Sequence, residues 1–136
     1  MNGDYVTRFL DLMDYLNTNA KKMGGKNIKD LMHKAVNEGR YECDKWDLKR
    51  FTYFCDLRNN IAHGGASYVT ELNNDSLFDM YFQGILILFI SSREWEVIVE
   101  NNDMYCYHKG RLKVKFSKRI KKVKQDRELL FIDFYR

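Results

Sequence analysis

Hydrophobic residues recur at three- and four-residue intervals through the first two thirds of the chain, which is the pattern of amphipathic helices. The first such helix is expected over residues 4–18. Its apolar positions are Val6, Phe9, Leu10, Met13 and Leu16. The polar run 17–19 and Gly24-Gly25 are expected to end it.

Three more helices follow from the same spacing. The second is expected to bury Ile28, Leu31, Met32, Ala35 and Val36, and to stop at Gly39. A third should begin near Asp44, whose side chain would cap it, and end at Gly64-Gly65. A fourth should be capped by Asp75 or Ser76 and run through Phe89.

The pattern changes after residue 94. Residues 95–99 are rich in β-prone side chains, and residues 104–108 and 112–116 flank Lys109-Gly110, which predicts a hairpin turn. Within 112–116 apolar residues alternate with lysines, the period-two pattern of a strand with one buried face and one basic face. Residues 129–135 predict a further strand.

These elements predict a mainly α protein: a four-helix unit over 1–100 with a small, basic, β-rich C-terminal appendage over 101–136, packed on the same domain. The 136 residues are 45% hydrophobic and 15% aromatic, which excludes a disordered chain. Three cysteines, odd in number and widely spaced, are typical of reduced thiols in a cytoplasmic protein. The apolar run 84–90 is much shorter than the roughly 20 residues that span a bilayer, so no membrane association is expected.

Positive charge is concentrated near the C-terminus. Residues 109–127 hold ten cations and one acid, whereas the whole chain carries a net charge of only +4. A basic segment on a mildly acidic body favours a polyanionic partner, and RNA is the first candidate. The residues expected to contact its phosphates are Lys113, Lys115, Lys118, Arg119, Lys121, Lys122 and Lys124. No aromatic-rich RNA-binding motif accompanies them, so contacts to the RNA backbone are expected.

Candidate chemistry lies at the end of the third helix. Arg58 is a permanent cation that binds phosphate well, and His63 can transfer a proton near neutral pH. Asn59 and His63 are four residues apart and share a helix face, so the amide could orient the imidazole. Arg58 and His63 lie roughly 140° apart around the axis. A long arginine stem, a loosened last turn before Gly64 or a second copy of the chain would bring them together.

The string Arg58-Asn59-Asn60-Ile61-Ala62-His63 resembles the signature of the HEPN superfamily, in which an arginine, usually followed by a polar residue, precedes a histidine by a short fixed gap. The resemblance implies an up-and-down four-helix bundle that forms a homodimer with one composite site. It also implies a metal-independent, cofactor-free endoribonuclease of a toxin–antitoxin or antiviral defence system. Such an enzyme cleaves RNA by attack of the 2′-hydroxyl.

Under this resemblance His63 would be the general acid and base, Arg58 would bind the scissile phosphate and Asn59 would support them. Some toxins of the family carry a tyrosine two residues after the histidine, where this chain has Gly65. Regulation through that tyrosine is therefore not expected here.

Other functions fit the same residues. The chain could be a non-catalytic HEPN-like dimer that binds RNA or protein. It could also be an antitoxin or assembly subunit whose C-terminal appendage pairs with the sheet edge of another protein. An antitoxin or a defence-system protein is a possible partner. A purely structural role is also open, because cations near a helix C-terminus oppose its dipole. Trp46, Phe51 and Phe54 are expected in the core, and Asp56 as a solvated carboxylate. Cys106 and His108 have metal-like spacing, but a hairpin face explains them better.

Overall fold

The fold comes from a computed structural model of the 136-residue chain. It describes the backbone of all residues except 1, 65–71, 93, 102, 118–119, 127–128 and 135–136. Side chains are described for residues 5–64, 72–92, 94–101 and 103–116.

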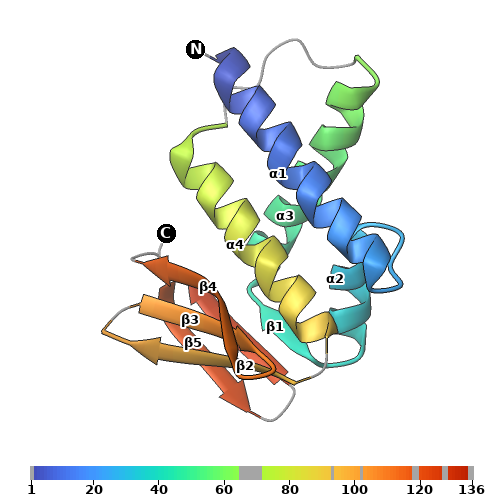
Figure 1. The fold of residues 1–136 in the computed structure, drawn as a ribbon. Helices are drawn as coiled ribbons and strands as arrows, with labels where there is room; N and C mark the ends of the chain where they lie inside the picture. Colours follow the sequence, from blue (N-terminus) through green and yellow to red (C-terminus); the bar gives the residue numbers. More distant parts are fainter. Residues whose placement is uncertain are drawn as a thin grey trace.

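The described chain forms four helices and six strands (Figure 1). The helices are α1 (Asn2–Lys22), α2 (Ile28–Asn37), α3 (Lys45–Ala62) and α4 (Asn74–Ser91). The strands are β1 (Tyr41–Cys43), β2 (Trp95–Glu100), β3 (Asp103–His108), β4 (Arg111–Ser117), β5 (Ile120–Asp126) and β6 (Leu129–Phe134). The predicted mainly helical fold with a C-terminal β-rich part is confirmed at this level.

The strands form two three-stranded sheets, ordered β2-β3-β4 and β1-β6-β5. The first sheet is an antiparallel meander whose β3–β4 turn is Lys109-Gly110. Both turn residues have positive φ, 53° and 74°, as a two-residue hairpin turn of type I′ requires. The predicted hairpin is therefore confirmed. In the second sheet β1, which lies between α2 and α3, pairs in parallel with β6 and so connects the helical part of the chain to its C-terminal strands.

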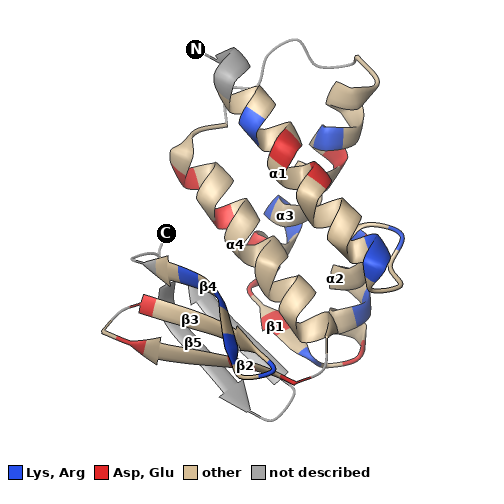
Figure 2. Ribbon diagram, in the orientation of Figure 1, with Lys and Arg blue, Asp and Glu red and all other residues tan. Residues whose placement is uncertain are grey.

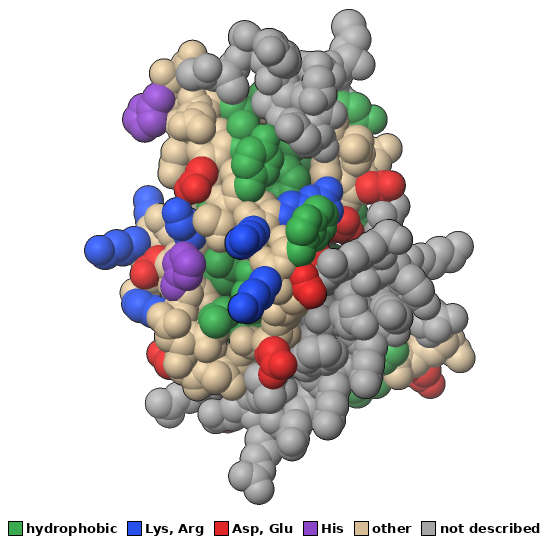
Figure 3. Space-filling model, turned by 180° about the vertical axis from the view of Figure 1, so that it is seen from behind, with side chains coloured by type: hydrophobic (Ala, Val, Ile, Leu, Met, Phe, Trp, Pro, Cys, Tyr) green, Lys and Arg blue, Asp and Glu red, His purple; other side chains and the backbone are tan. Residues whose placement is uncertain are grey.

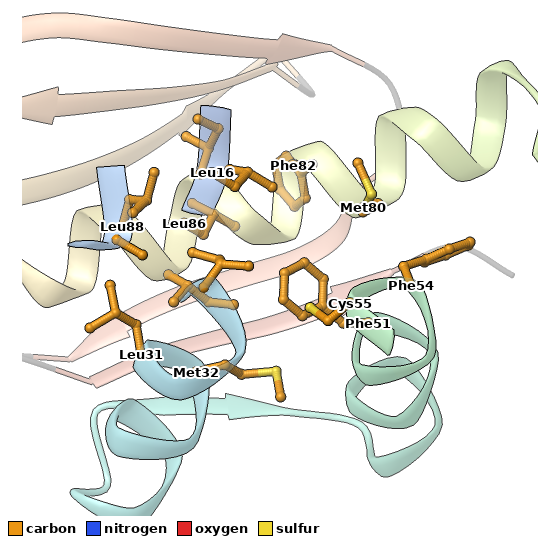
Figure 4. Packing of buried hydrophobic residues seen from close by; sticks show 14 of the residues in the cluster. Leu16, Leu31, Met32, Phe51, Phe54, Cys55, Met80, Phe82, Leu86 and Leu88 are labelled. Atoms are coloured by element: carbon orange, nitrogen blue, oxygen red, sulfur yellow. The ribbon is translucent and has the colours of Figure 1, made fainter. Parts of the chain in front are cut away.

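Helix α4 lies at the centre of the core. Every residue from Phe82 to Ile90 is buried, so this helix has neighbours on all sides. Figure 4 shows side chains from α1, α2 and α3 gathered around it. On the sheet side, Phe116 of β4 packs edge-on against Phe82, with ring centroids 4.4 Å apart. Helices and sheet thus share one hydrophobic core.

Side-chain caps fix where the helices begin. Asp44 caps α3 as predicted, accepting a hydrogen bond of 2.7 Å from the Trp46 amide. The cap of α4 is Asn73 instead of Asp75 or Ser76, and Ser76 closes a reciprocal capping box with it. The predicted cap of the fourth helix was therefore wrong, although Ser76 takes part in it.

Polar residues 17–19 do not end the first helix, which continues to Lys22. Asn19 donates its side-chain amide to the carbonyl of Tyr15, and Asn17 accepts from the backbone of Ile28 at 3.0 Å. These contacts let asparagine stay inside the helix while it fixes the start of α2. The end predicted at residue 18 was too early for this reason.

The direction of the helices differs from an up-and-down bundle, in which the first and fourth helices are antiparallel. Arg8 donates to Asn74 at 2.9 Å, and Tyr15 lies against Tyr81 with ring centroids 6.2 Å apart. Because these contacts advance together along both helices, α1 and α4 run parallel. Hydrophobic periodicity specifies the buried face of a helix but not its direction across a neighbour.

Three further features were missed or wrong. Strands β1 and β5 were not predicted, since β1 has only three residues and the pattern of β5 is dominated by lysines. Trp46 was expected in the core with Phe51 and Phe54; the two phenylalanines are buried, but Trp46 is 54% exposed. The described helices include none that is long and apolar enough to cross a membrane.

The contact between α1 and α4 yields a stability prediction. A Cβ atom added to Gly84 would lie 2.8 Å from Cδ2 of Leu16, a residue with no exposed surface. We expect Gly84→Val to lower the free energy of unfolding by about 1–3 kcal/mol through overpacking. Urea denaturation measures the change. Ala62→Val, at an exposed position of α3, is the control for a β-branched residue in a helix and should cost less than 1 kcal/mol, about the range of helix propensities.

Candidate functional site

The three residues of the candidate motif lie at the C-terminal end of α3. Asn59 and His63 are exposed, and Arg58 retains 32% side-chain exposure. His63 is the C-cap: its backbone N–H donates to the Asn59 carbonyl at 3.1 Å, and its φ and ψ are −94° and 12°. Gly64 follows with a φ of 74°, so the chain leaves the helix directly after the histidine. The imidazole is therefore accessible to a ligand.

Arg58 is held by a carboxylate from another helix. Its Nε and Nη2 atoms both donate to Oδ1 of Asp14 on α1, at 3.1 and 2.9 Å. Its Nη1 atom lies 3.5 Å from Oδ1 of Asn59. The contact with Asp14 fixes the plane of the guanidinium and offsets part of its charge, while Nη1 makes the weakest of the three contacts. A bound phosphate would meet a cation that is oriented in advance.

Asn59 does not have the partner that its spacing suggested. Its side-chain oxygen faces Arg58, and the His63 imidazole makes no hydrogen bond to a described residue. The expectation that Asn59 orients the imidazole is therefore wrong for this structure. The reason is that His63 has left helical geometry as the C-cap, so the simple i, i+4 relation between side chains no longer holds.

Asp14 was not predicted from the sequence. It lies 44 positions before Arg58, and the sequence pattern marks it only as a polar residue on the outer face of an amphipathic helix. Only the crossing of α1 and α3 brings the two charges together. Asp56 likewise has a partner that was not predicted, an exposed ion pair with Lys29 of α2 at 2.9 Å.

One face of α3 is exposed over its whole length. It carries side chains at intervals of three and four residues, ending on the motif histidine: Trp46, Lys49, Tyr53, Asp56, Asn60 and His63. Trp46 is 54% and Tyr53 43% exposed, unusual values for large aromatic side chains. Figure 3, which views the molecule from the back, shows hydrophobic side chains at the surface among basic ones. We call this set of six residues the α3 stripe.

The basic surface predicted from the sequence is described in part. Lys113 and Lys115 are exposed on β4, and Figure 2 shows basic positions along that strand. Lys115 lies 3.5 Å from Asp103 of β3. Lys118 and Arg119 lie outside the described residues. The same holds for the side chains of Lys121, Lys122 and Lys124, although their backbone forms β5.

The cysteines are free thiols. Burial raises the pKa of Cys55 and of Cys106 to about 12, so neither is a ready thiolate nucleophile. Among the residues with described side chains, no group of three or more His, Cys, Asp or Glu is arranged to hold a metal ion.

Comparisons with protein-family models, with curated proteins and with solved structures find no match for this chain.

The buried thiols give a prediction about pH. Because folding raises their pKa, Cys55 and Cys106 stabilise the fold fully below their unfolded pKa near 9, and this contribution is lost as the pH rises toward 12. The free energy of unfolding should therefore fall above about pH 9. At pH 8 a thiol reagent such as Ellman's should label Cys55 and Cys106 only after urea unfolds the chain. Rapid labelling of Cys106 in the native protein would contradict its burial.

Proposed function

We propose that this protein is a HEPN-type, metal-independent endoribonuclease that acts as a homodimer. The observation that carries the proposal is the accessible imidazole of His63 at the end of the helix that also holds Arg58, a guanidinium oriented by Asp14. A permanent phosphate-binding cation and an accessible proton-transfer group near the end of one helix are the minimum that cleavage by the RNA 2′-hydroxyl requires.

The reaction follows from the chemistry of the two side chains. The ribose 2′-oxygen loses its proton to a base and bonds to the adjacent phosphorus. The bond from phosphorus to the 5′-oxygen breaks, and that oxygen takes a proton from an acid. The products are a 2′,3′-cyclic phosphate and a 5′-hydroxyl. Arg58 would stabilise the charge on the phosphoryl oxygens, and Asn59, which contacts Arg58, would support it.

A second copy of the chain would solve a problem of proton transfer. One imidazole cannot serve at once as the base for the 2′-hydroxyl and as the acid for the 5′-oxygen. Two copies of His63 across a two-fold axis would provide both. The α3 stripe supports such a dimer, because its exposed Trp46 and Tyr53 lie on the helix face that ends at His63.

The cellular role that fits this chemistry is a toxin or antiviral effector in the cytoplasm, held in check by an antitoxin or another defence-system protein. The basic C-terminal part, with Lys113 and Lys115 exposed on β4, would attract the RNA substrate. No metal or cofactor is needed for the proposed reaction.

A second candidate function is RNA binding without cleavage by the same dimer. The ion pair between Arg58 and Asp14 favours it, because a guanidinium already engaged by a carboxylate has less charge to offer a phosphate. In that case the motif would have a structural role at the junction of α1 and α3, and cleavage would be absent.

Removal of the imidazole tests the nuclease. In EDTA, His63→Ala should reduce cleavage of single-stranded RNA by about 10²–10⁴-fold, the usual contribution of a positioned proton-transfer group. Cleavage is followed on a 5′-labelled RNA by gel electrophoresis. His33→Ala, which removes an exposed histidine of α2, is the matched control and should retain full activity. Equal cleavage by wild type and His63→Ala would rule out the proposed role of His63.

Introducing a negative charge into the α3 stripe tests whether the stripe forms the dimer contact. Tyr53→Glu should convert the protein to a monomer and abolish cleavage, because a carboxylate would be buried at the proposed contact. Light scattering measures the mass. The control is Met23→Glu, which places the same charge at a hydrophobic residue that is 40% exposed and lies just beyond the end of α1. A Tyr53→Glu monomer that still cleaves RNA would show that one chain is sufficient.

A further inference from the structure

The β2-β3-β4 sheet has two chemically different faces. Its strand pairing places Met104, Cys106 and Phe116 together on the inner face, where they are buried beneath α4. The residues between them must point to the opposite face. On β3 these are Tyr105 and Tyr107, both half-buried, with Ile98 of β2 paired to Tyr105. An antiparallel meander thus presents two tyrosines side by side on its central strand.

Cations border these tyrosines on the β4 side. Lys115 pairs directly with Tyr105, and its ammonium lies 5.5 Å from the centre of the tyrosine ring. Arg111 and Lys113 are also exposed on β4. The register between β3 and β4 shifts between Cys106 and Tyr107. Lys113 of β4 is therefore a bulge residue that is not paired opposite any residue of β3. Aromatic rings and cations are therefore interleaved across neighbouring strands, a pattern that is invisible in either strand alone.

The charge changes sign across the sheet. Glu96 and Glu100 lie on β2, on the other side of the tyrosines from the cations, whereas Asp103 at the end of β3 pairs with Lys115. The distribution of charge and aromatic rings on this face suits a particular kind of ligand. Such a ligand is anionic along one edge and carries planar, hydrogen-bonding groups along the other. Single-stranded RNA has this chemistry, with phosphates on one side and stacking bases with amino groups on the other.

We propose that the outer face of the β2-β3-β4 sheet binds single-stranded RNA. Two successive bases stack on Tyr105 and Tyr107, and the phosphates follow Lys113 and Lys115 along β4. The two tyrosines are two strand residues apart, about 7 Å. That is twice the roughly 3.4 Å rise of a stacked strand, so the face suits an extended RNA and not a duplex.

The choice of RNA as ligand rests on the proposed function, but the stacking mechanism can be tested without cleavage. The probe is a 5′-fluorescein-labelled, unstructured 12-nucleotide RNA, and the readout is its fluorescence anisotropy with the His63→Ala protein. Adding Tyr105→Ala should raise Kd about 5- to 150-fold, the range for loss of one stacked base. Tyr105→Phe keeps the ring and should stay within about twofold.

Two controls separate stacking from general damage. Tyr15→Ala removes an exposed tyrosine of α1 and should leave Kd unchanged. An oligomer of the same length that lacks bases should bind more weakly and should not distinguish Tyr105→Ala from its parent. Circular dichroism verifies that each variant is folded, and Tyr107→Ala, at the neighbouring position, repeats the test if Tyr105→Ala does not fold.

The outcomes are distinct for the two proposals. Tyrosine-dependent RNA binding by a protein that never cleaves RNA would refute the nuclease and support the sheet as a binding face. Cleavage by the wild type together with an unchanged Kd in Tyr105→Ala and Tyr107→Ala would overturn the sheet proposal alone. Equal losses in Tyr105→Ala and Tyr105→Phe would also overturn it, because the ring would then not be the binding group. Absence of any RNA binding by the His63→Ala protein would overturn the sheet proposal, whereas the nuclease is judged by cleavage alone.

Discussion

The burial of α4 on every side is the constraint on which this structure depends. Helix α4 has nine consecutive buried residues, Phe82 to Ile90, so the chain must supply neighbours around its full circumference. Helices α1 and α2 cover part of it, and the β2-β3-β4 sheet covers another part through Phe116. Gly84 lets α1 approach closely enough to place Leu16 against the helix backbone. A four-helix bundle alone would leave the sheet side of α4 in water, which explains why the β-rich part shares its core.

The packing around α4 also determines which ion pair Arg58 of the motif forms. Contacts of α1 with α4, from Arg8 at Asn74 to the buried Leu16 at Gly84, fix the rotation of α1 about its axis. That rotation directs Asp14 toward Arg58. Nε and Nη2 of Arg58 both donate to the same carboxylate oxygen of Asp14, and the second hydrogen bond costs little further side-chain entropy, so the guanidinium is oriented before any ligand arrives. The affinity of Arg58 for phosphate then depends on the strength of its ion pair with Asp14. The six-residue motif does not include Asp14, so the motif alone does not determine this affinity.

The sequence predicted what depends on short-range spacing. The four helices, the Lys109-Gly110 hairpin and the Asp44 cap all follow from residues within one or two turns of each other. It also located an exposed histidine at the end of α3. What it could not predict depends on packing between distant segments: the parallel course of α1 and α4, the pairing of β1 with β6, and Asp14 as the partner of Arg58. Trp46 was misplaced because hydrophobic character alone does not distinguish a core residue from one at an exposed helix face.

The hydrophobic core around α4 also determines which face of β3 carries its tyrosines, which the sequence pattern alone does not decide. Residues 104–107 alternate between a buried and a half-buried position, but alternation alone does not say which face is outside. The anchoring of Met104, Cys106 and Phe116 against α4 decides it. A shift of the register by one residue would bury both tyrosines and expose the thiol of Cys106, at the cost of the contact between Phe116 and Phe82. The aromatic face beside Lys115 is therefore a consequence of the way in which α4 is covered, and not an independent feature of the basic segment.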